Sequence, residues 1–172
     1  MILGLDVSTS IVGVCVYDHK NEVLVKADYI DLRKVGSFLH KAQAVEDYIA
    51  NNLMSYDIDH IFIEEALMFF RRGGSTAKTM SILQRFNGIV SWICFKSLSI
   101  TPDYISPISA RSKCGIKVPR GKKAKEVVME HFIQTKEFPL TYTRYGNIQK
   151  YCYDIADAVV VAKAAAKIIL DR

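Results

Sequence analysis

Hydrophobic residues near the N-terminus fall into three short runs, which predict three β-strands. The runs span Ile2–Asp6, Ile11–Tyr17 and Glu22–Ile30, and a short polar turn separates each run from the next. Short turns between consecutive strands favour antiparallel pairing. We therefore expect a three-stranded antiparallel meander at the start of the chain.

The hydrophobic pattern changes to a helical period after this meander. Apolar side chains recur every three or four positions from Leu39 to Leu53, which predicts a helix from about Val35 to Leu53. The next run, Ile58–Glu64, is apolar at consecutive positions. Such a run is typical of a central strand that is covered on both faces.

The second half of the chain predicts three more helices and one short strand. In order, we expect a helix from about Ser75 to Leu98, a strand over Asp103–Ser106, an irregular segment over Ala110–Gly121, a helix over Lys122–Phe132, a loop over Phe138–Lys150 and a largely buried helix over Asp154–Leu170. Strands that alternate with helices form parallel pairs. The pattern predicts one α/β domain over residues 1–172, with a mixed five-stranded sheet of three antiparallel and then two parallel strands, and helices on both faces.

The net charge of +5 conceals an uneven distribution of charged residues. Residues 66–125 hold twelve Lys/Arg and one acid, Asp103, whereas the other 112 residues hold 11 Lys/Arg and 17 Asp/Glu. The middle of the chain therefore carries a formal charge of +11 and the remainder −6. A basic segment in an otherwise acidic chain favours a polyanionic partner such as nucleic acid, although a solvated basic surface fits the same pattern.

The composition disfavours several classes of protein. No apolar run reaches the ~18–20 residues of a membrane-spanning helix, and the N-terminus lacks the pattern of a signal peptide. The four cysteines and four histidines are scattered, so a zinc site or a disulfide framework is not expected. We expect reduced, mostly buried cysteines in a cytoplasmic protein of a bacterium or of a cell infected by a phage or virus.

Four acidic residues stand where apolar segments end or where the last helix begins. Asp6 closes the first predicted strand, and Glu64 closes the fourth. Asp154 and Asp157 open the last helix, and their spacing of three places them on one face. Carboxylates gathered at one place repel each other and lose hydration, and a divalent cation, Mg²⁺ or Mn²⁺, offsets both costs. Each acid taken singly also fits a capping role, so the inference depends on the set.

Three motifs resemble the RuvC-type Holliday junction resolvases of the ribonuclease H-like (retroviral integrase) superfamily. They are Ile2-Leu-Gly-Leu-Asp6 with Gly13 seven residues later, Phe62-Ile-Glu64-Glu65, and Asp154-Ile-Ala-Asp157-Ala158-Val159. The motifs occur in the family's order and span nearly the whole chain. Strand alternation directs Glu64 and Glu65 to opposite faces, and the acid follows an isoleucine in the family's motif, which favours Glu64.

The resemblance implies a ribonuclease H-like fold and a metal-dependent endonuclease that cuts four-way DNA junctions as a homodimer. It implies that Asp6, Glu64, Asp154 and Asp157 are the catalytic, metal-binding acids. Two Mg²⁺ (or Mn²⁺) ions ~3.5–4 Å apart would activate a water and stabilise the departing oxygen, leaving 5′-phosphate and 3′-hydroxyl ends. A two-fold protein matches a two-fold junction that is cut by paired symmetric nicks.

Two positions depart from the family's pattern. The family usually has a glycine two residues after the first acid, where this chain has Ser8, whose hydroxyl would lie close to a phosphate or a metal-bound water. Three residues after Glu64, where an aromatic residue often probes the opened junction, stands Leu67, followed by Phe69 and Phe70. We expect Phe69 or Phe70 to stack on a base, a contact worth ~1–3 kcal/mol, although this apolar run also suits a hydrophobic core.

Basic residues follow the aromatic pair and recur farther along the chain, and we predict that they bind the DNA strand. They are Arg71, Arg72, Arg111, Lys113, Lys117, Arg120, Lys122, Lys123 and Lys125. The last three lie at or near a predicted helix start, where backbone N–H groups also favour phosphate. The alternative interpretation is a basic loop that keeps the protein in solution.

Three other functions fit parts of the sequence. Leu3-Gly-Leu-Asp6-Val-Ser-Thr9 resembles a phosphate loop of sugar kinases and actin-like ATPases, but these proteins need two such domains and 172 residues are too few. The presence of all four acids argues against a catalytically inactive DNA-binding module. A related nuclease that prefers flaps, RNA–DNA hybrids or other branched DNA is the main alternative, because loops outside the motifs determine substrate choice.

Overall fold

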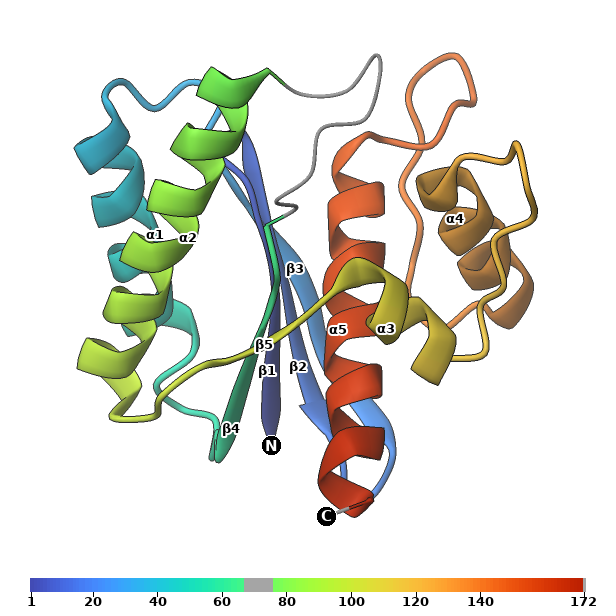
Figure 1. Ribbon diagram of the computed structural model, residues 1–172, viewed down its shortest axis with the longest axis horizontal. Helices are drawn as coiled ribbons and strands as arrows, with labels where there is room; N and C mark the ends of the chain where they lie inside the picture. The colour runs from blue at the N-terminus through green and yellow to red at the C-terminus, as the bar shows by residue number, and fades with distance from the viewer. Residues whose placement is uncertain (67–75, 172) are drawn as a thin grey trace.

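The computed structural model describes residues 1–66 and 76–171, and a five-stranded mixed sheet forms its centre (Figure 1). Three strands form an antiparallel meander: β1 (Ile2–Val7), β2 (Ile11–Asp18) and β3 (Val23–Asp31). Two further strands are parallel to their neighbours: β4 (His60–Glu64) pairs with β1, and β5 (Asp103–Ile105) pairs with β4. The strand order is β3-β2-β1-β4-β5, which confirms the predicted sheet.

Helices cover both faces of the sheet (Figure 1). α1 (Phe38–Asn52) and α2 (Ala77–Leu98) pack on one face, and α5 (Tyr151–Leu170) packs on the other, flanked by α3 (Pro107–Lys113) and α4 (Ala124–Thr135). Strand alternation explains the two cores. Leu3 and Leu5 of β1 belong to the core beneath α1 and α2, whereas Ile2 belongs to the core beneath α5.

Two glycines let α5 approach the sheet closely. A Cβ added at Gly4 of β1 would lie 2.7 Å from the carbonyl oxygen of Ala158, and one added at Gly13 of β2 would lie 2.0 Å from that of Asp154. Any larger residue at either position would push the helix away from the strands. Because β1 and β2 pair at Asp6 and Gly13, this contact brings the start of α5 over the end of β1.

The segment 110–121, expected to be irregular, proves to begin in a helix. α3 runs to Lys113, its N-cap Ser106 accepts a hydrogen bond from the Ser109 N–H, and Pro107 occupies the first turn. Ala110 is fully buried in the core beneath α5. The glycines and cations of this segment suggested a loop, but the tertiary contact of its apolar face with α5 stabilises the helix.

The helix starts differ slightly from the expected ones: α1 begins at Phe38 and α4 at Ala124, rather than near Val35 and Lys122. α2 begins at Ala77, with Thr76 as its N-cap, and the expected start at Ser75 lies outside the described residues. α5 begins at Tyr151, so Asp154 lies in its first turn rather than at its first position. The periodic pattern of hydrophobic residues predicts the ends of a helix less accurately than its middle, because the first turn carries few buried side chains.

The cysteines are reduced in the structure, and most of them are buried. All four cysteines are free, and Cys15, Cys94 and Cys152 are buried, as predicted. Across residues 1–66 and 76–171, no helix has the length and apolar character needed to cross a membrane.

Candidate active site

Asp6 and Glu64 are neighbours at the carboxyl ends of the two central strands. Leu5 of β1 pairs with Ile63 of β4 in parallel register, so the acids that follow them lie side by side. Glu64 shares the strand face of Phe62, which packs in the core beneath α5. Both carboxylates therefore stand on the sheet face that α5 covers.

α5 adds Asp154 and Asp157 to this pair of acids. Their side chains are 18% and 8% exposed, and both form ion pairs with Lys125 near the start of α4. The Lys125 Nζ atom lies 3.1 Å from Asp154 Oδ1 and 3.4 Å from Asp157 Oδ2. The structure thus gathers the four predicted acids, and we call Asp6, Glu64, Asp154 and Asp157 the carboxylate cluster.

Burial and mutual repulsion raise the pKa values of three carboxyls in the cluster. At Asp6, burial is the largest cause, and the charges of Glu64 and Asp157 raise its pKa further, well above the ordinary value. At Glu64, burial and then the charge of Asp157 raise the pKa to about 7. Burial also raises the pKa of Asp157, against the opposing charge of Lys125. Such a concentration of desolvated negative charge favours a bound cation.

Lys125 compensates part of this charge. Its partial burial alone would lower the pKa of the ammonium, but the carboxylates of Asp6, Asp157 and Asp154 raise it above its usual value. The side chain therefore stays protonated over the physiological range. Sequence reasoning placed Lys125 with the DNA-binding residues, and only the packing of α4 on α5 shows its contact with the acids.

Glu65 does not take part in the cluster. Its side chain is exposed, and its backbone N–H donates a hydrogen bond of 2.9 Å to the Ile105 carbonyl. Asn87 of α2, only 5% exposed, donates from Nδ2 to the Glu64 carbonyl oxygen at 3.0 Å. Sequence reasoning missed Asn87 as a support for Glu64, although a buried amide within the apolar face of α2 is a recognisable signal.

Besides Lys125, one predicted DNA-binding cation acts on the cluster, and it shares an open pocket with two others. Arg111 of α3 acts on the cluster directly, because its positive charge lowers the pKa values of Glu64 and Asp157 against their burial. Arg111, Lys117 and Lys122 also line an open pocket of about 510 Å³ along α3 and the loop that leads to α4. A pocket lined by three cations suits a phosphate, and the role of these cations in strand binding stays a prediction.

Other predicted cations do not converge on the cluster. Lys113 forms an ion pair of 3.1 Å with Asp171, just beyond the far end of α5. Lys123 pairs with Glu126 at 3.2 Å, and Arg120 is exposed in the loop before α4. Their role in strand binding stays a prediction.

Ser8 closes the turn between β1 and β2. Its hydroxyl donates a hydrogen bond of 2.7 Å to the Ile11 carbonyl and accepts one of 3.1 Å from the Ile11 N–H. The predicted phosphate contact of Ser8 would have to share this hydroxyl with the turn. Four other predicted DNA-binding residues lie outside the described part of the chain: Phe69, Phe70, Arg71 and Arg72.

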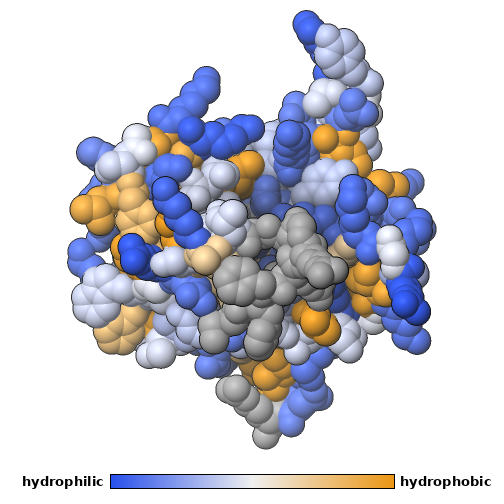
Figure 2. Space-filling model, turned by 45° about the horizontal axis from the view of Figure 1, so that its top comes forward, coloured by the Kyte–Doolittle hydropathy of each residue, from blue (hydrophilic) through white to orange (hydrophobic). Residues whose placement is uncertain are grey.

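The end of the molecule that carries the cluster turns toward the viewer in Figure 2, and most of its described surface is hydrophilic. No protein-family model and no curated protein sequence matches the chain. Solved structures, in contrast, match nearly all of it. Thermus thermophilus RuvC in complex with a Holliday junction substrate superposes with a TM-score of 0.69 at 13% identity, covering 98% of this chain and 94% of that chain.

Two further structures agree with this match. Another T. thermophilus RuvC structure gives a TM-score of 0.63 at 15% identity over 99% of this chain and 96% of that one. The yeast mitochondrial Holliday junction resolvase Ydc2 gives a TM-score of 0.61 at 12% identity, covering 96% of this chain and 77% of that chain. The chain has the RuvC fold. The resemblance that the three motifs carry is thereby confirmed for the architecture, and within this RuvC fold the carboxylate cluster stands at the ends of β1 and β4, beneath the start of α5.

Proposed function

We propose that this chain, as one nuclease domain over residues 1–172, is a metal-dependent endonuclease that resolves four-way DNA junctions by paired symmetric nicks. The products would carry 5′-phosphate and 3′-hydroxyl ends. The observation that carries the proposal is the gathering of Asp6 and Glu64 with Asp154 and Asp157, in which burial and repulsion raise carboxyl pKa values. The RuvC fold adds support, because one matched structure is RuvC in complex with a Holliday junction.

The chemistry of the cluster fits Mg²⁺ or Mn²⁺. All four side chains offer carboxylate oxygens, the ligands that these hard cations prefer. Asp6, Glu64, Asp154 and Asp157 would hold the metal, and two bound ions would supply an activated water and stabilise the departing oxygen of the phosphate.

The surrounding residues hold the acids and the substrate in place. Asn87 anchors the backbone of Glu64, and Lys125 offsets part of the charge of Asp154 and Asp157 in the metal-free protein. We assign Arg111 to the phosphate of the scissile strand, because it acts electrostatically on Glu64 and Asp157 from the side of the open pocket.

Paired nicks require two active sites, so the functional unit would be a homodimer. A two-fold dimer presents its two clusters to the two equivalent strands of a junction. Sedimentation equilibrium should give twice the monomer mass for the purified chain alone, or the mass of two chains plus the DNA once a junction is bound.

The decisive experiment is cleavage of a synthetic four-way junction beside duplex, flap and RNA–DNA hybrid controls. Wild type should make symmetric paired nicks in the junction with Mg²⁺ and none with EDTA, and Asp6→Asn should bind the junction without cutting it. Cleavage that survives in EDTA or in Asp6→Asn would overturn the proposal. Preferential cutting of flaps or hybrids would instead favour the related nuclease with broader specificity.

A further inference from the structure

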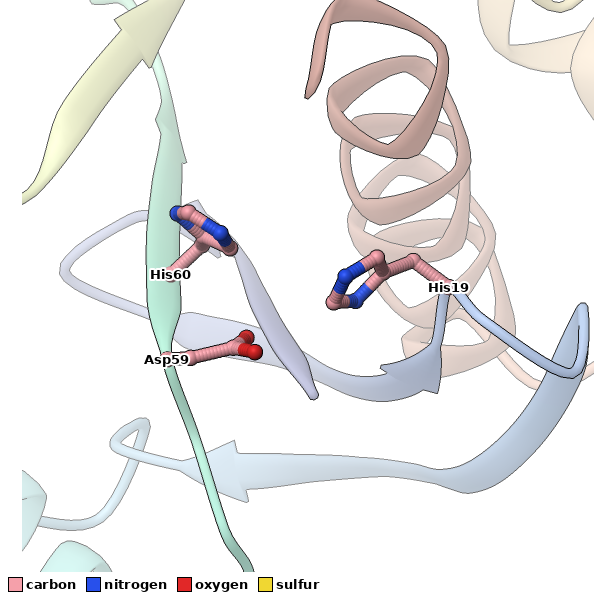
Figure 3. A group of neighbouring side chains, drawn as sticks. All are labelled: His19, Asp59 and His60. Atoms are coloured by element: carbon pink, nitrogen blue, oxygen red, sulfur yellow. The ribbon is translucent and has the colours of Figure 1, made fainter. Parts of the chain in front are cut away.

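Two histidines and an aspartate gather at the end of the sheet remote from the carboxylate cluster. His19 directly follows β2, and Asp59 and His60 stand at the start of β4. Donor atoms from the three side chains, one from each, all lie within 4.8 Å of one another. Figure 3 shows the Asp59 and His60 side chains projecting toward the ring of His19, and the two rings lie edge to face with centroids 5.8 Å apart.

The sheet brings these residues together across β1. Ile2 pairs with Tyr17 of β2 on one side and with His60 of β4 on the other, and His19 follows Tyr17 by two positions. His60 is four residues from Glu64 along β4, which separates the two sites by about 13 Å. The scattered sequence positions of the histidines gave no reason to expect a zinc site, but His19 and His60 meet through strand pairing.

The buried ring of His19 has a nitrogen without a partner in the described part of the chain, which is an independent indication of a binding site. The His19 side chain is only 9% exposed, and its Nδ1 atom is buried without a hydrogen-bond partner among the described residues. A buried imidazole nitrogen normally has a donor, an acceptor or a metal as its partner. The ring nevertheless faces an aspartate and a second histidine, which are metal-ligating side chains (Figure 3).

We propose that His19, Asp59 and His60 bind one Zn²⁺ ion in a site separate from the carboxylate cluster. Two imidazole nitrogens and one carboxylate oxygen are a donor set that zinc accepts and that Mg²⁺ does not favour. Zinc binds N and O donors at ~2.0–2.2 Å. Side-chain rotations that move each donor atom by about 1 Å would bring all three to this distance from one ion. The Asp59 side chain is 41% exposed, which leaves the ion a path from solvent and a fourth position for water.

The three residues lie at or beside the ends of two strands of the sheet, β2 and β4, that are separated by β1. A bound ion would tie the end of β2 to the start of β4 across β1, so its expected effect is on the stability of the fold. The Met1 ammonium already contacts Asp59 Oδ1 at 2.9 Å and the Asp57 carbonyl at 2.6 Å. Zinc therefore shares the Asp59 carboxylate with this ammonium or displaces it.

Zinc titration of the full chain tests the proposal. The chain is freed of any histidine tag, kept in excess Mg²⁺, and titrated with Zn²⁺ in competition with a chromophoric chelator. Wild type should bind one tight zinc, and His60→Ala should weaken that affinity by about 100-fold or more, since even an outer-shell partner can be worth 10–100-fold. His40→Ala is the matched control, because His40 is an exposed histidine of α1.

Asp6→Asn separates the two sites in the same titration. It should keep the tight zinc if the ion binds at His19, Asp59 and His60. Loss of the tight zinc in Asp6→Asn, unchanged affinity in His60→Ala, or no tight zinc in wild type would each overturn the proposal. Thermal unfolding gives a second readout: zinc should raise the melting temperature of wild type and His40→Ala but not that of His60→Ala, whose metal-free melting temperature reports whether it folds.

Discussion

The carbonyl oxygen of Asp154 rests against Gly13, so closely that a Cβ added to the glycine would lie 2.0 Å from it. Gly13 is also the register partner of Asp6. The separation of α5 from β2 therefore sets how far Asp154 stands from Asp6. The geometry of the carboxylate cluster thus depends on a residue that has no side chain.

Gly13→Ala should destabilise the fold and slow junction cleavage together. The new methyl group must push the start of α5 away from β2, and overpacking of this kind costs ~1–3 kcal/mol. Urea denaturation and a cleavage assay measure both effects. Gly88→Ala, at an exposed position of α2 where an added Cβ meets nothing within 4 Å, is the control and should stabilise by up to ~1 kcal/mol. A Gly13→Ala protein as stable and active as wild type would contradict this account of the packing.

Glu64→Gln should abolish cleavage, whereas Glu65→Gln should leave it near the wild-type rate. Glu64 faces the other acids and Glu65 is exposed on the opposite side of the strand. Loss of a metal ligand should cost at least as much as loss of an outer-shell partner, about 10–100-fold. Single-turnover cleavage of a four-way junction in Mg²⁺ compares the two neighbours. Equal losses in both would show that the strand face has been assigned incorrectly.

The metal-free protein should become less stable as the pH rises from about 4.5 to about 7. Burial and then the Asp157 charge raise the folded-state pKa of Glu64 from 4.5 to about 7, so the folded state holds a proton that the unfolded chain has already released. A shift of this size corresponds to roughly 3 kcal/mol. Urea denaturation in EDTA at about pH 5 and about pH 8 measures the loss.

Two comparisons connect this pH effect to the cluster. Glu64→Gln should remove much of the difference between the two pH values, because it has no proton to lose. Excess Mg²⁺ should restore stability mainly at the higher pH, where the carboxylates are ionised. Stability that is independent of pH in metal-free wild type would be evidence against a desolvated cluster.

Lys125→Met should bind Mg²⁺ more tightly than wild type yet cleave more slowly. The Lys125 ammonium competes with a cation for Asp154 and Asp157, but it also adds positive charge where a phosphate approaches. Isothermal calorimetry of Mg²⁺ binding and a cleavage assay separate the two effects. Lys123→Met removes a neighbouring exposed cation that pairs with Glu126, and it should change neither quantity much. Weaker Mg²⁺ binding in Lys125→Met would refute the competition.

Replacing Arg111, Lys117 and Lys122 by glutamine should flatten the salt dependence of junction binding. These residues line one open pocket along α3, and the charge of Arg111 also acts on Glu64 and Asp157. For each DNA phosphate that the variant no longer neutralises, the slope of log K against log salt should fall by about 0.9 in duplex DNA. The matched control is Lys113→Gln, whose ammonium pairs with Asp171 at the far end of α5. An unchanged slope in the triple variant would place the DNA elsewhere.

Local patterns in the sequence predicted most of the fold. The alternation of side chains in β1 and the helical period of α1 depend on neighbouring residues, so the elements and their order could be recognised from the chain alone. The failure at α3 has a tertiary cause, because the burial of Ala110 beneath α5 outweighs the loop-like composition of the segment.

The sequence by itself determined which acids come together, since parallel strands β1 and β4 end at the same edge and bring Asp6 and Glu64 side by side. Only the tertiary structure decided that Lys125 lies between Asp154 and Asp157, because that contact depends on how α4 packs against α5. The meeting of His19 with His60 likewise requires β1 to lie between β2 and β4. Contacts of this kind join residues far apart in the chain, and no local period of hydrophobic residues encodes them.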